Sequence, residues 1–448
     1  MELESVFCDL QIPLDLKTAQ IEASRCYYCY DAPCIQACPT EIDIPSFIRK
    51  ISNQNVKGAA VDILSANIMG ATCARVCPVE ILCQRACVRE KSEAKPVQIG
   101  QLQRFATDEY FRKDVLKSSQ EPAFVRAKST GKQVAVVGAG PAGLSCAHRL
   151  ALFGHEVMVY EAREKSGGLN EYGLAPYKMT HGIAQKEIDF ILSVGGIKIE
   201  NNRKLGKDIL LSDLQKQFSA VFLGLGLGGT NELNIPGEEL IGVLSAVDMI
   251  ATIRQTKELS KMAISKMGIP SEVVVIGGGN TAIDISIQMK KLGAQIVNLV
   301  YRRGPGEMGA TQHEIELAQK NGVRILNWLK PVKIEGNAGT VRSIQFEYTE
   351  NREGKILGTG KFLNLKADAI YKAIGQRLAL DFLKTEGLNL KLHRQKISVD
   401  KNFETSVPGV YAGGDAIEAG QDLTVTAVQQ GKLAALAIHQ RLEGKRNG

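Results

Sequence analysis

The strongest constraint on the fold is a glycine-marked unit that occurs twice in this chain of 448 residues. The segment QVAVVGAGPAGLSCAHRLALFGHEVMVYEA (133–162) contains an apolar β-branched run, a glycine turn, a helical pattern and a second apolar run. The segment SEVVVIGGGNTAIDISIQMKKLGAQIVNLVYRR (271–303) repeats this order. Each has the pattern of a βαβ unit that opens a doubly wound parallel sheet. Two copies predict two nucleotide-binding domains.

The first glycine turn has the spacing of a dinucleotide-binding fingerprint. Gly138 permits the tight turn, Gly140 lets a pyrophosphate approach the backbone, and Gly143 allows close helix–strand packing. The following helix directs its N-terminal N–H groups and the positive end of its dipole at the phosphates. Glu161 ends the second strand, 18 residues after Gly143, where a carboxylate is expected to accept hydrogen bonds from ribose hydroxyls.

The second glycine turn reads G-x-G-x-x-A. Gly277 and Gly279 form the same phosphate cradle, and Ala282 at the third position loosens helix–strand packing slightly. Asn280 and Thr281 begin the following helix and complete the predicted site for a nicotinamide dinucleotide. This turn therefore predicts the second nucleotide-binding domain.

The end of the second strand in this unit bears on the choice of nucleotide. The strand ends in Tyr301, Arg302 and Arg303, with no acidic residue there. A carboxylate at this point favours a free 2′-hydroxyl, whereas a pair of guanidinium groups can hold a 2′-phosphate in forked hydrogen bonds. The pattern favours NADPH over NADH. The alternative is that the two arginines are only a solvated strand end.

Cysteine usage separates the first quarter of the chain from the rest. Eight of the ten cysteines lie between residues 26 and 87. In a large intracellular protein, such a concentration indicates metal binding or catalysis rather than structural disulfides. The two runs are Cys26-x2-Cys29-x4-Cys34-x3-Cys38-Pro39 and Cys73-x3-Cys77-Pro78, with Cys83 and Cys87 after the second.

Short cysteine loops place several thiolates around one small cube, as a [4Fe–4S] cluster requires. The first run resembles the bacterial ferredoxin run, in which the last cysteine, just before proline, ligates the other cluster. This predicts that Cys26, Cys29 and Cys34 share one cluster, while Cys38 contributes to a second. A structural zinc site is the alternative, since paired cysteines also form tetrahedral sites.

The net charge and the apolar runs exclude several classes of partner. The formal net charge is +7, and no block of five or six like charges occurs, so the pattern favours neither nucleic acid nor an anionic membrane. The N-terminal segment MELESVFCDLQIPLDLK has early acidic residues and no apolar core, unlike a secretory signal. No run approaches the roughly 20 apolar residues that span a bilayer. We therefore expect a cytoplasmic protein without a membrane span.

Two further glycine turns point to a flavoprotein. Gly168 belongs to a Gly-Gly turn after the first unit, and Gly414 and Asp415 belong to the turn VYAGGDA near the C-terminus. A GxGxxG turn, a GG turn and a late GGD turn together resemble the two-dinucleotide flavoprotein disulfide-reductase superfamily. The resemblance implies that Asp415 binds the ribityl chain of FAD. It also implies that a helix beginning near Thr424 points its N-terminus at the flavin pyrimidine ring.

These patterns predict an α/β fold with two Rossmann-like dinucleotide-binding domains, preceded by an α-helical domain that binds two iron–sulfur clusters. Within the helical domain, the apolar spacing of GAAVDILSANIMGATCARVC (58–77) predicts a helix. The expected domains are a helical iron–sulfur domain (1–112), a linker (113–132), a first FAD-binding part (133–245), an NAD(P)-binding domain (246–368) and a second FAD-binding part (369–448).

The segments ASRCYYCYDAPCIQACPTEIDIPSFIRKI, GATCARVCPVEILCQRACVRE and PVQIGQLQRFATD resemble the N-terminal part of the dihydropyrimidine dehydrogenases. The resemblance covers nearly the whole chain. It implies one cluster held by Cys26, Cys29, Cys34 and Cys87. It implies a second held by Cys38, Cys77, Cys83 and the side chain of Gln103. Cys73 would then be no ligand, although a count of eight cysteines for two clusters would make it the eighth.

The resemblance implies an electron-input subunit that moves hydride from NAD(P)H to FAD. Electrons would pass through two [4Fe–4S] clusters to an FMN and iron–sulfur partner that reduces uracil or thymine to the 5,6-dihydro form. No catalytic side chain is expected, because the cofactors carry this chemistry. The small subunit of NADPH-dependent glutamate synthase has the same architecture and is the alternative. It differs in a tighter second cysteine run and in carrying glutamate where this chain has Gln103. A third possibility is a zinc-bound interaction module on an inactive flavoprotein fold.

Overall fold

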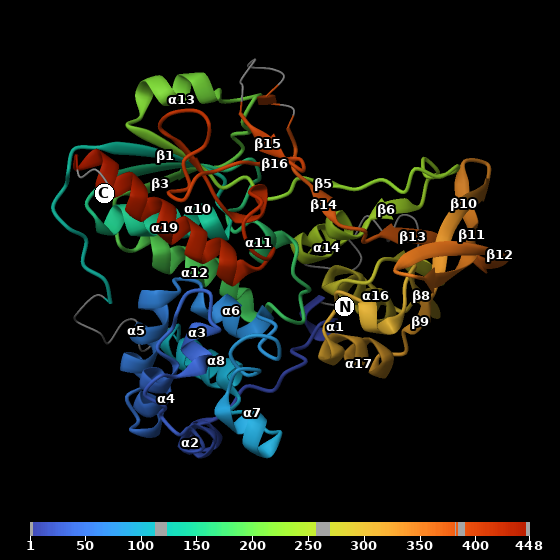
Figure 1. The fold of residues 1–448 in the computed structure, drawn as a ribbon, viewed down its shortest axis with the longest axis horizontal. Coiled ribbons are helices and arrows are strands. Elements are labelled where there is room, and N and C mark those ends of the chain that lie inside the picture. Colours follow the sequence, from blue (N-terminus) through green and yellow to red (C-terminus); the bar gives the residue numbers. More distant parts are fainter. Residues whose placement is uncertain (1–2, 113–122, 257–268, 381, 384–389, 445–448) are drawn as a thin grey trace. The chain divides into compact units, whose positions relative to one another are not determined.

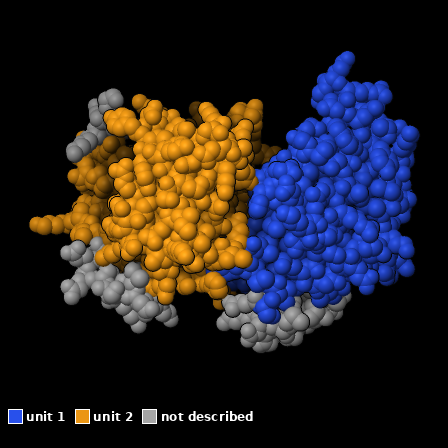
Figure 2. All heavy atoms as spheres, turned by 90° about the horizontal axis from the view of Figure 1, so that it is seen from below, with its two compact units in different colours: residues 1–10, 172–180, 228–377 blue, residues 11–171, 181–227, 378–448 orange. Residues whose placement is uncertain are grey.

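The computed structural model describes residues 3–112, 123–256, 269–380, 382–383 and 390–444. The chain divides into two compact units, which Figure 2 shows in different colours. Unit 1 comprises residues 1–10, 172–180 and 228–377, and unit 2 comprises residues 11–171, 181–227 and 378–448. Each unit is therefore assembled from segments that are distant in the sequence.

Unit 2 is built around a five-stranded sheet in which all neighbouring strands are parallel. Its strand order is β17 (Val410–Ala412), β4 (Ala220–Leu223), β1 (Gln133–Val137), β2 (Glu156–Tyr160) and β3 (Ile197–Glu200). The glycine-marked run predicted as a βαβ unit is β1, α10 (Pro141–Leu152) and β2, as expected. This βαβ unit therefore places its glycine turn at the carboxyl end of β1, the central strand of the sheet.

Helices of unit 2 pack on this sheet and supply most of its core. α10 packs against β1, β2 and α19 (Thr424–Leu442), and α10 and α19 lie side by side in Figure 1. α19 begins at the predicted residue, Thr424. The other elements that lie wholly or partly in unit 2 are α11 (Leu169–Tyr172), η1 (Thr180–Gly182), α12 (Ile183–Leu192), α13 (Leu211–Gln217), β15 (Leu392–His393), β16 (Lys396–Ile397) and η4 (Gly414–Ala416).

The cysteine-rich part of unit 2 consists of short helices joined by the cysteine loops (Figure 1, blue). Its core is formed by apolar side chains of α4, α5 and α8, including Phe47, Ile63 and Leu102. The helices are α2 (Leu16–Ser24), α3 (Pro33–Gln36), α4 (Ile44–Ser52), α5 (Val56–Ala66), α6 (Gly70–Val76), α7 (Val88–Glu93) and α8 (Ile99–Tyr110).

The helix predicted over residues 58–77 is interrupted. α5 ends at Ala66 and α6 begins at Gly70. Asn67 between them is extended, with φ −136° and ψ 98°, and its side-chain Oδ1 accepts a hydrogen bond from Met69 N–H. A short polar side chain that bonds its own backbone competes with helix continuation. The apolar spacing continues across this break, and for that reason the periodicity alone did not reveal it.

Unit 1 contains a second five-stranded parallel sheet with the corresponding plan. Its strand order is β6 (Val243–Ser245), β13 (Ala369–Lys372), β7 (Glu272–Ile276), β8 (Ile296–Tyr301) and β9 (Arg324–Asn327). The predicted second βαβ unit is β7, α16 (Asn280–Leu292) and β8. The remaining elements are α1 (Leu3–Val6), β5 (Gly229–Thr230), α14 (Ala246–Gln255), η3 (Pro305–Glu307), α17 (Gln312–Lys320), β10 (Leu329–Asn337), β11 (Thr340–Arg352), β12 (Lys355–Lys366) and β14 (Gln376–Arg377).

The structure corrects the predicted domain boundaries. The predicted FAD-binding parts, 133–245 and 369–448, included β6 and β13, but β13 pairs with β6 and with β7 in the sheet of unit 1. Residues 1–10 and 172–180 also belong to unit 1, where Phe7, Ala175 and Tyr177 pack in its core. Strand pairing between distant segments decided these borders, and a change of composition along the chain does not report it. Of the predicted linker 113–132, residues 113–122 lie outside the described residues.

None of the helices in the described part of the chain, including α19 with its 19 residues, is both long and apolar enough to cross a membrane.

Candidate functional site

The glycine turn of unit 2 has no room for side chains at two of its three glycines. Gly138 has φ +101°, and a Cβ added there would lie 2.3 Å from the carbonyl oxygen of Gly224. A Cβ on Gly143 would lie 1.8 Å from the carbonyl oxygen of Gly138. A Cβ on Gly140 would make only ordinary contact, 3.7 Å from Gly168 Cα, and as the N-cap of α10 this glycine has no side-chain cap among the described residues. The turn is thus a tight cradle whose free helix N–H groups suit a pyrophosphate.

Glu161 is fixed against this cradle. It is buried, and its Oε2 accepts a hydrogen bond from Ala139 N–H at 2.8 Å. Its Oε1 accepts a hydrogen bond from Arg163 N–H at 2.9 Å. A carboxylate oxygen has two lone pairs, so each oxygen can still accept a ribose hydroxyl. The backbone bonds were not part of the sequence interpretation; they hold the carboxylate where the predicted role needs it.

The other two turns meet the first one. Gly168 has φ +55°, and a Cβ there would lie 2.7 Å from Gly140 Cα. Gly414 N–H donates to Oε1 of Gln430 at 2.7 Å, which fastens the late turn to α19. The Asp415 carboxyl has no hydrogen-bond partner among the described residues, and burial raises its pKa to about 6. A half-buried carboxyl without a partner beside a glycine turn fits the predicted contact with ribityl hydroxyls.

The N-terminus of α19 adjoins this group. No described side chain caps it at Leu423, while Thr424 Oγ1 donates to Oδ1 of Asn170 at 3.2 Å. An uncapped helix N-terminus presents free N–H groups and positive potential. Together with the three turns, it fits a dinucleotide that carries a ring able to hold negative charge, such as FAD.

The glycine turn of unit 1 is looser. Gly277 has φ +147°, and a Cβ there would lie 2.2 Å from the carbonyl oxygen of Ala373. A Cβ on Gly279 would meet nothing within 4 Å. Asn280 Oδ1 accepts a long hydrogen bond from Thr311 N–H at 3.4 Å. Gly279 is the N-cap of α16 without a side-chain cap, and the half-buried Thr281 follows in the first turn. The cradle therefore suits a nucleotide with an open approach.

The two arginines after β8 are not used by the fold. Arg302 is exposed and Arg303 is half-buried. The backbone carbonyl of Arg302 accepts a hydrogen bond from Thr349 Oγ1, and that of Arg303 accepts hydrogen bonds from Trp328 N–H and Asn327 Nδ2. In the described residues neither guanidinium forms an ion pair. Both side chains are compatible with the predicted phosphate contact and equally with a solvated strand end.

A buried ion-pair group in unit 1 was not foreseen from the sequence. Lys178 Nζ lies 2.8 Å from Asp284 Oδ1 and 2.6 Å from Glu314 Oε1. Tyr177 OH donates to the same Asp284 oxygen at 2.8 Å. The group joins the segment 172–180 to α16, the helix that follows the glycine turn. Its members are far apart in the sequence, and no local pattern brings them together.

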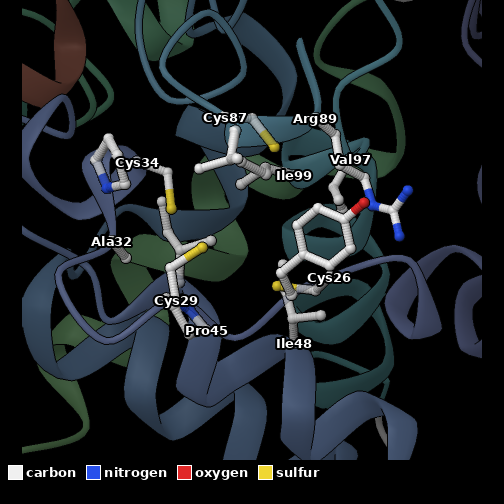
Figure 3. A pocket seen from close by; sticks show the side chains of 14 residues that line it. Cys26, Cys29, Ala32, Cys34, Pro45, Ile48, Cys87, Arg89, Val97 and Ile99 are labelled. Atoms are coloured by element: carbon white, nitrogen blue, oxygen red, sulfur yellow. The ribbon is translucent and has the colours of Figure 1, made fainter. Parts of the chain in front are cut away.

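The first cysteine cavity is surrounded by four thiols, those of Cys26, Cys29, Cys34 and Cys87. Figure 3 shows their sulfur atoms facing one another across the same space. Burial, then the neighbouring thiols, raises the pKa of Cys34 to about 12. Four crowded thiolates are thus unfavourable by themselves and need the positive charge of metal. The set is the one implied by the family resemblance.

The second cavity has five candidate ligands for four positions. They are Cys38, Cys73, Cys77, Cys83 and Gln103, which all line it. A hydrogen bond with Cys73, followed by burial, holds the pKa of Cys77 well above its usual range. Thr40 Oγ1 lies 3.4 Å from Cys38 Sγ. The geometry does not choose between Cys73 and Gln103.

Two further features of unit 2 orient this cavity. Gln103 Nε2 donates to the carbonyl of Gly70 at 2.7 Å, which leaves Oε1 free of any described hydrogen bond. Val425, in the first turn of α19, also lines the cavity. The second cavity therefore lies at the N-terminus of α19, the helix end that adjoins the three glycine turns. No described group of three or more His, Cys, Asp or Glu side chains is arranged around a single metal ion.

Buried polar contacts join the cysteine-rich part to the FAD-binding part. Lys432 Nζ on α19 donates to the carbonyl of Ala66 at 3.0 Å. Glu187 on α12 accepts hydrogen bonds from the N–H groups of Ala71 and Thr72 and so caps α6. Burial raises the pKa of Glu187 to about 7, although these bonds oppose the shift. The cysteine-rich part is thus tied to the part that contains the three glycine turns within one unit.

Comparison with known families matches two parts of the chain. Residues 132–431 match the pyridine nucleotide-disulphide oxidoreductases. Residues 4–115 match the family described as dihydropyrimidine dehydrogenase domain II, 4Fe-4S cluster. The two matches cover the glycine-turn region and the cysteine-rich region respectively.

Curated relatives are similar over nearly the whole length. A protein of Escherichia coli O157:H7 named NAD-dependent dihydropyrimidine dehydrogenase subunit PreT is 38% identical over 424 residues, covering 94% of each chain. The protein of that name in Escherichia coli K12 is 37% identical over 423 residues, again covering 94% of each. The Salmonella typhimurium protein of that name is 35% identical, with the same coverage.

Solved structures show the same fold at low identity. FprA of Mycobacterium tuberculosis in complex with NADPH has a TM-score of 0.57 and 18% identity, covering 71% of this chain and 87% of that one. Thioredoxin reductase of T. acidophilum has a TM-score of 0.53 and 22% identity, covering 69% of this chain and 99% of that one. The predicted two-domain reductase fold is confirmed by these similarities.

Proposed function

Because this chain belongs to the pyridine nucleotide-disulphide oxidoreductases and to the family of the NAD-dependent dihydropyrimidine dehydrogenase subunits, we propose that it is the electron-input subunit of such a dehydrogenase. It holds FAD in unit 2, binds NAD(P)H in unit 1 and carries [4Fe–4S] clusters in the cysteine-rich part. The relatives of that name match over 94% of their length, so the proposal concerns the whole chain.

One observation carries the proposal beyond the family match. Val425 belongs both to the helix N-terminus at the FAD site and to the wall of the second cysteine cavity. The three glycine turns and both cysteine cavities lie in the same compact unit. Electron transfer requires such proximity within a rigid frame. The short path from the N-terminus of α19 to the second cysteine cavity therefore supports an electron-transfer protein over a zinc-bound interaction module, which does not require such proximity.

The cofactors supply the redox chemistry: FAD takes hydride from NAD(P)H, and the clusters pass on single electrons. The chain supplies position and charge. The tight cradle at Gly138 and Gly143 would hold the pyrophosphate of FAD. Glu161 and Asp415 would accept hydrogen bonds from hydroxyl groups of FAD. The N-terminus of α19 favours negative charge on the flavin ring. No side chain is needed as an acid or a base.

Two observations point to different nucleotides. Arg302 is exposed and unpaired among the described residues, which supports a bound 2′-phosphate and hence NADPH. The relatives are named NAD-dependent, which supports NADH. Steady-state rates of flavin reduction with each nucleotide decide between them.

The partner is proposed from the names of the relatives, which are called subunits. It is an FMN- and iron–sulfur-containing subunit that reduces uracil or thymine. The glutamate synthase alternative has less support, because the relatives described above carry the dehydrogenase name.

The test of this function is co-purification with the FMN and iron–sulfur subunit, followed by assay with NADH and NADPH against uracil and thymine. We expect pyrimidine-dependent oxidation of at least one nucleotide, and bound flavin and iron in the anaerobically purified chain. If the pair oxidises neither nucleotide with either pyrimidine, the substrate assignment is wrong. A colourless protein containing zinc overturns the electron conduit as a whole.

We further propose two [4Fe–4S] clusters, one held by Cys26, Cys29, Cys34 and Cys87 and one by Cys38, Cys77, Cys83 and Gln103. The first set surrounds one cavity, and Gln103 Oε1 is free at the wall of the other.

The choice between Gln103 and Cys73 can be tested with a pair of variants, Gln103→Ala and Cys73→Ala. We expect Gln103→Ala to lose or shift the electron paramagnetic resonance signal of one cluster and to leave FAD content unchanged. Cys73→Ala is the matched control, since its side chain lines the same cavity, and it should keep both signals. The reverse pattern makes Cys73 the fourth ligand.

A further inference from the structure

The second cavity has a polar wall that its ligands do not account for. Asn67, in the break between α5 and α6, lines this cavity beside the thiols of Cys38, Cys77 and Cys83. The Asn67 side chain is completely buried. A buried polar group left without a partner costs about 1–3 kcal/mol. Each polar atom of this amide therefore calls for a partner.

One half of the Asn67 amide is satisfied by the chain itself. Oδ1 accepts a hydrogen bond from Met69 N–H at 3.0 Å. This bond settles which way the amide faces, because a flipped amide would set two donors against each other. The Nδ2 group has no hydrogen-bond partner among the described residues. Its N–H bonds therefore remain in the cavity wall without an acceptor.

Gln103 shows the opposite arrangement at the same backbone break. Its Nε2 donates to the carbonyl of Gly70, so its free atom is the acceptor Oε1. An oxygen lone pair can bind iron, whereas an N–H group can only donate. Sulfur is the acceptor that an iron–sulfur cluster offers. The two amides are both held by backbone groups of residues 69–70. The Oε1 atom of Gln103 thus suits an iron atom, and the Nδ2 group of Asn67 suits a sulfur atom of the same cluster.

We propose that Asn67 Nδ2 donates a hydrogen bond to a sulfur atom of the cluster in the second cavity and so raises the reduction potential of that cluster. The proposal rests on the function proposed above, which places a cluster there. Hydrogen bonds to the sulfur atoms of a cluster stabilise the more negative, reduced state. The hydrogen bond from Asn67 thereby favours reduction of the cluster in the second cavity, which lies beside the N-terminus of α19.

Among the described side chains that line the first cavity, none is a buried amide with an unpartnered N–H group. Its wall is largely aliphatic, and its polar side chains are Tyr27 and Arg89. The Arg89 guanidinium is engaged by the carbonyl of Arg25 and the carboxylate of Glu93, and it stacks over the Tyr27 ring with 4.0 Å to the ring centroid. Removal of the Asn67 donor should therefore affect one cluster only.

The test is a redox titration of the anaerobically purified full chain, followed by electron paramagnetic resonance, for the wild type, Asn67→Asp and Asn67→Leu. Asn67→Asp keeps the acceptor for Met69 N–H and removes the donor, and Asn67→Leu removes both. We expect about a tenfold less favourable reduction of one cluster, equal to about 59 mV for one electron, with the other cluster unchanged. Unchanged midpoints in both variants overturn the inference.

Asn55→Asp is the matched control. Asn55 is exposed at the other end of α5, where its Oδ1 caps the helix, and the aspartate adds the same charge while keeping the cap. It should move neither midpoint. If both Asn67 variants lose iron, the wild type labelled with ¹⁵N-asparagine decides: a hyperfine coupling of one cluster to that nitrogen supports the bond, and its absence overturns it. A wild type without iron instead refutes the proposed function itself.

Discussion

The two glycine turns share one backbone plan but differ in how closely they are packed. In unit 2 the third glycine, Gly143, lies so close to the Gly138 carbonyl that no Cβ fits. In unit 1 the corresponding residue is Ala282, whose side chain is fully buried in the core. The strand ends differ as well: Glu161 is buried and bonded to the backbone, whereas Arg302 is exposed.

This difference separates a resident cofactor from an exchanging one. A closed cradle with a fixed carboxylate holds its dinucleotide through many preorganised contacts and loses little entropy on binding. A looser cradle with a solvated strand end binds through fewer fixed groups and releases its ligand readily. Unit 2 is thus suited to retain FAD, and unit 1 is suited to exchange a nicotinamide nucleotide.

The largest expected effect comes from exchanging the third residues of the two turns. Gly143→Ala places a Cβ 1.8 Å from the Gly138 carbonyl, so the backbone must move. We expect the purified protein to lose its flavin and unit 2 to be destabilised by about 3 kcal/mol. Flavin absorbance and urea unfolding measure both.

The reverse exchange, Ala282→Gly, is the matched control for Gly143→Ala. It adds backbone freedom in a helix and removes one buried methyl group, which together cost about 2 kcal/mol, and it should leave FAD in place. Equal losses in the two variants would show that the two turns are not packed differently.

The next effect concerns the strand end of unit 1. If Arg302 holds a 2′-phosphate, Arg302→Ala should raise KM for NADPH about tenfold, the equivalent of one charge-assisted hydrogen bond, and leave KM for NADH within twofold. Arg324→Ala is the control, because Arg324 is also exposed but begins β9. Unchanged NADPH kinetics would reduce Arg302 to a solvated strand end and favour NADH.

The smallest effect is a difference in pH response between the units. Glu187 in unit 2 is buried without a cation in salt-bridge contact among the described residues, and its pKa is raised to about 7. The buried Asp284 of unit 1 is paired with Lys178, whose pKa is raised by the carboxylates against the effect of burial. Unit 2 should therefore lose stability as the pH rises through neutrality, because Glu187 must then ionise without a cation in contact with it among the described residues.

The sign follows from linkage. A carboxyl with a raised folded-state pKa contributes its full stabilisation below its ordinary pKa and loses it as the pH rises through about 7. Glu187→Gln removes this dependence. The free energy of unfolding of the variant, relative to that of the wild type, should therefore increase by about 1–3 kcal/mol from pH 5 to pH 8 in urea unfolding. Asp189→Asn, on the exposed side of α12, is the control. A constant difference across this range would contradict the prediction.

Local patterns predicted the parts of the fold that depend on neighbours in the sequence. Both βαβ units and the glycine turns follow from periods and turn residues within about 30 positions, and the structure has them as predicted. The start of α19 near Thr424 was implied by the family resemblance. The prediction of one continuous helix over 58–77 was wrong. The apolar period is unbroken there, but the hydrogen bond from Met69 N–H to the Asn67 side chain interrupts the helix.

The sequence by itself determined that this chain builds two nucleotide cradles and a cysteine-rich redox region, since glycine conformations and thiol chemistry are properties of the residues themselves. Only the tertiary structure decided which segments share a unit, that β13 pairs with β6, and that Asn67, in the α5–α6 break, and Gln103, on α8, reach one cavity. Those contacts join positions far apart in the chain. Their free energy comes from burial and pairing across space, and no local pattern records it.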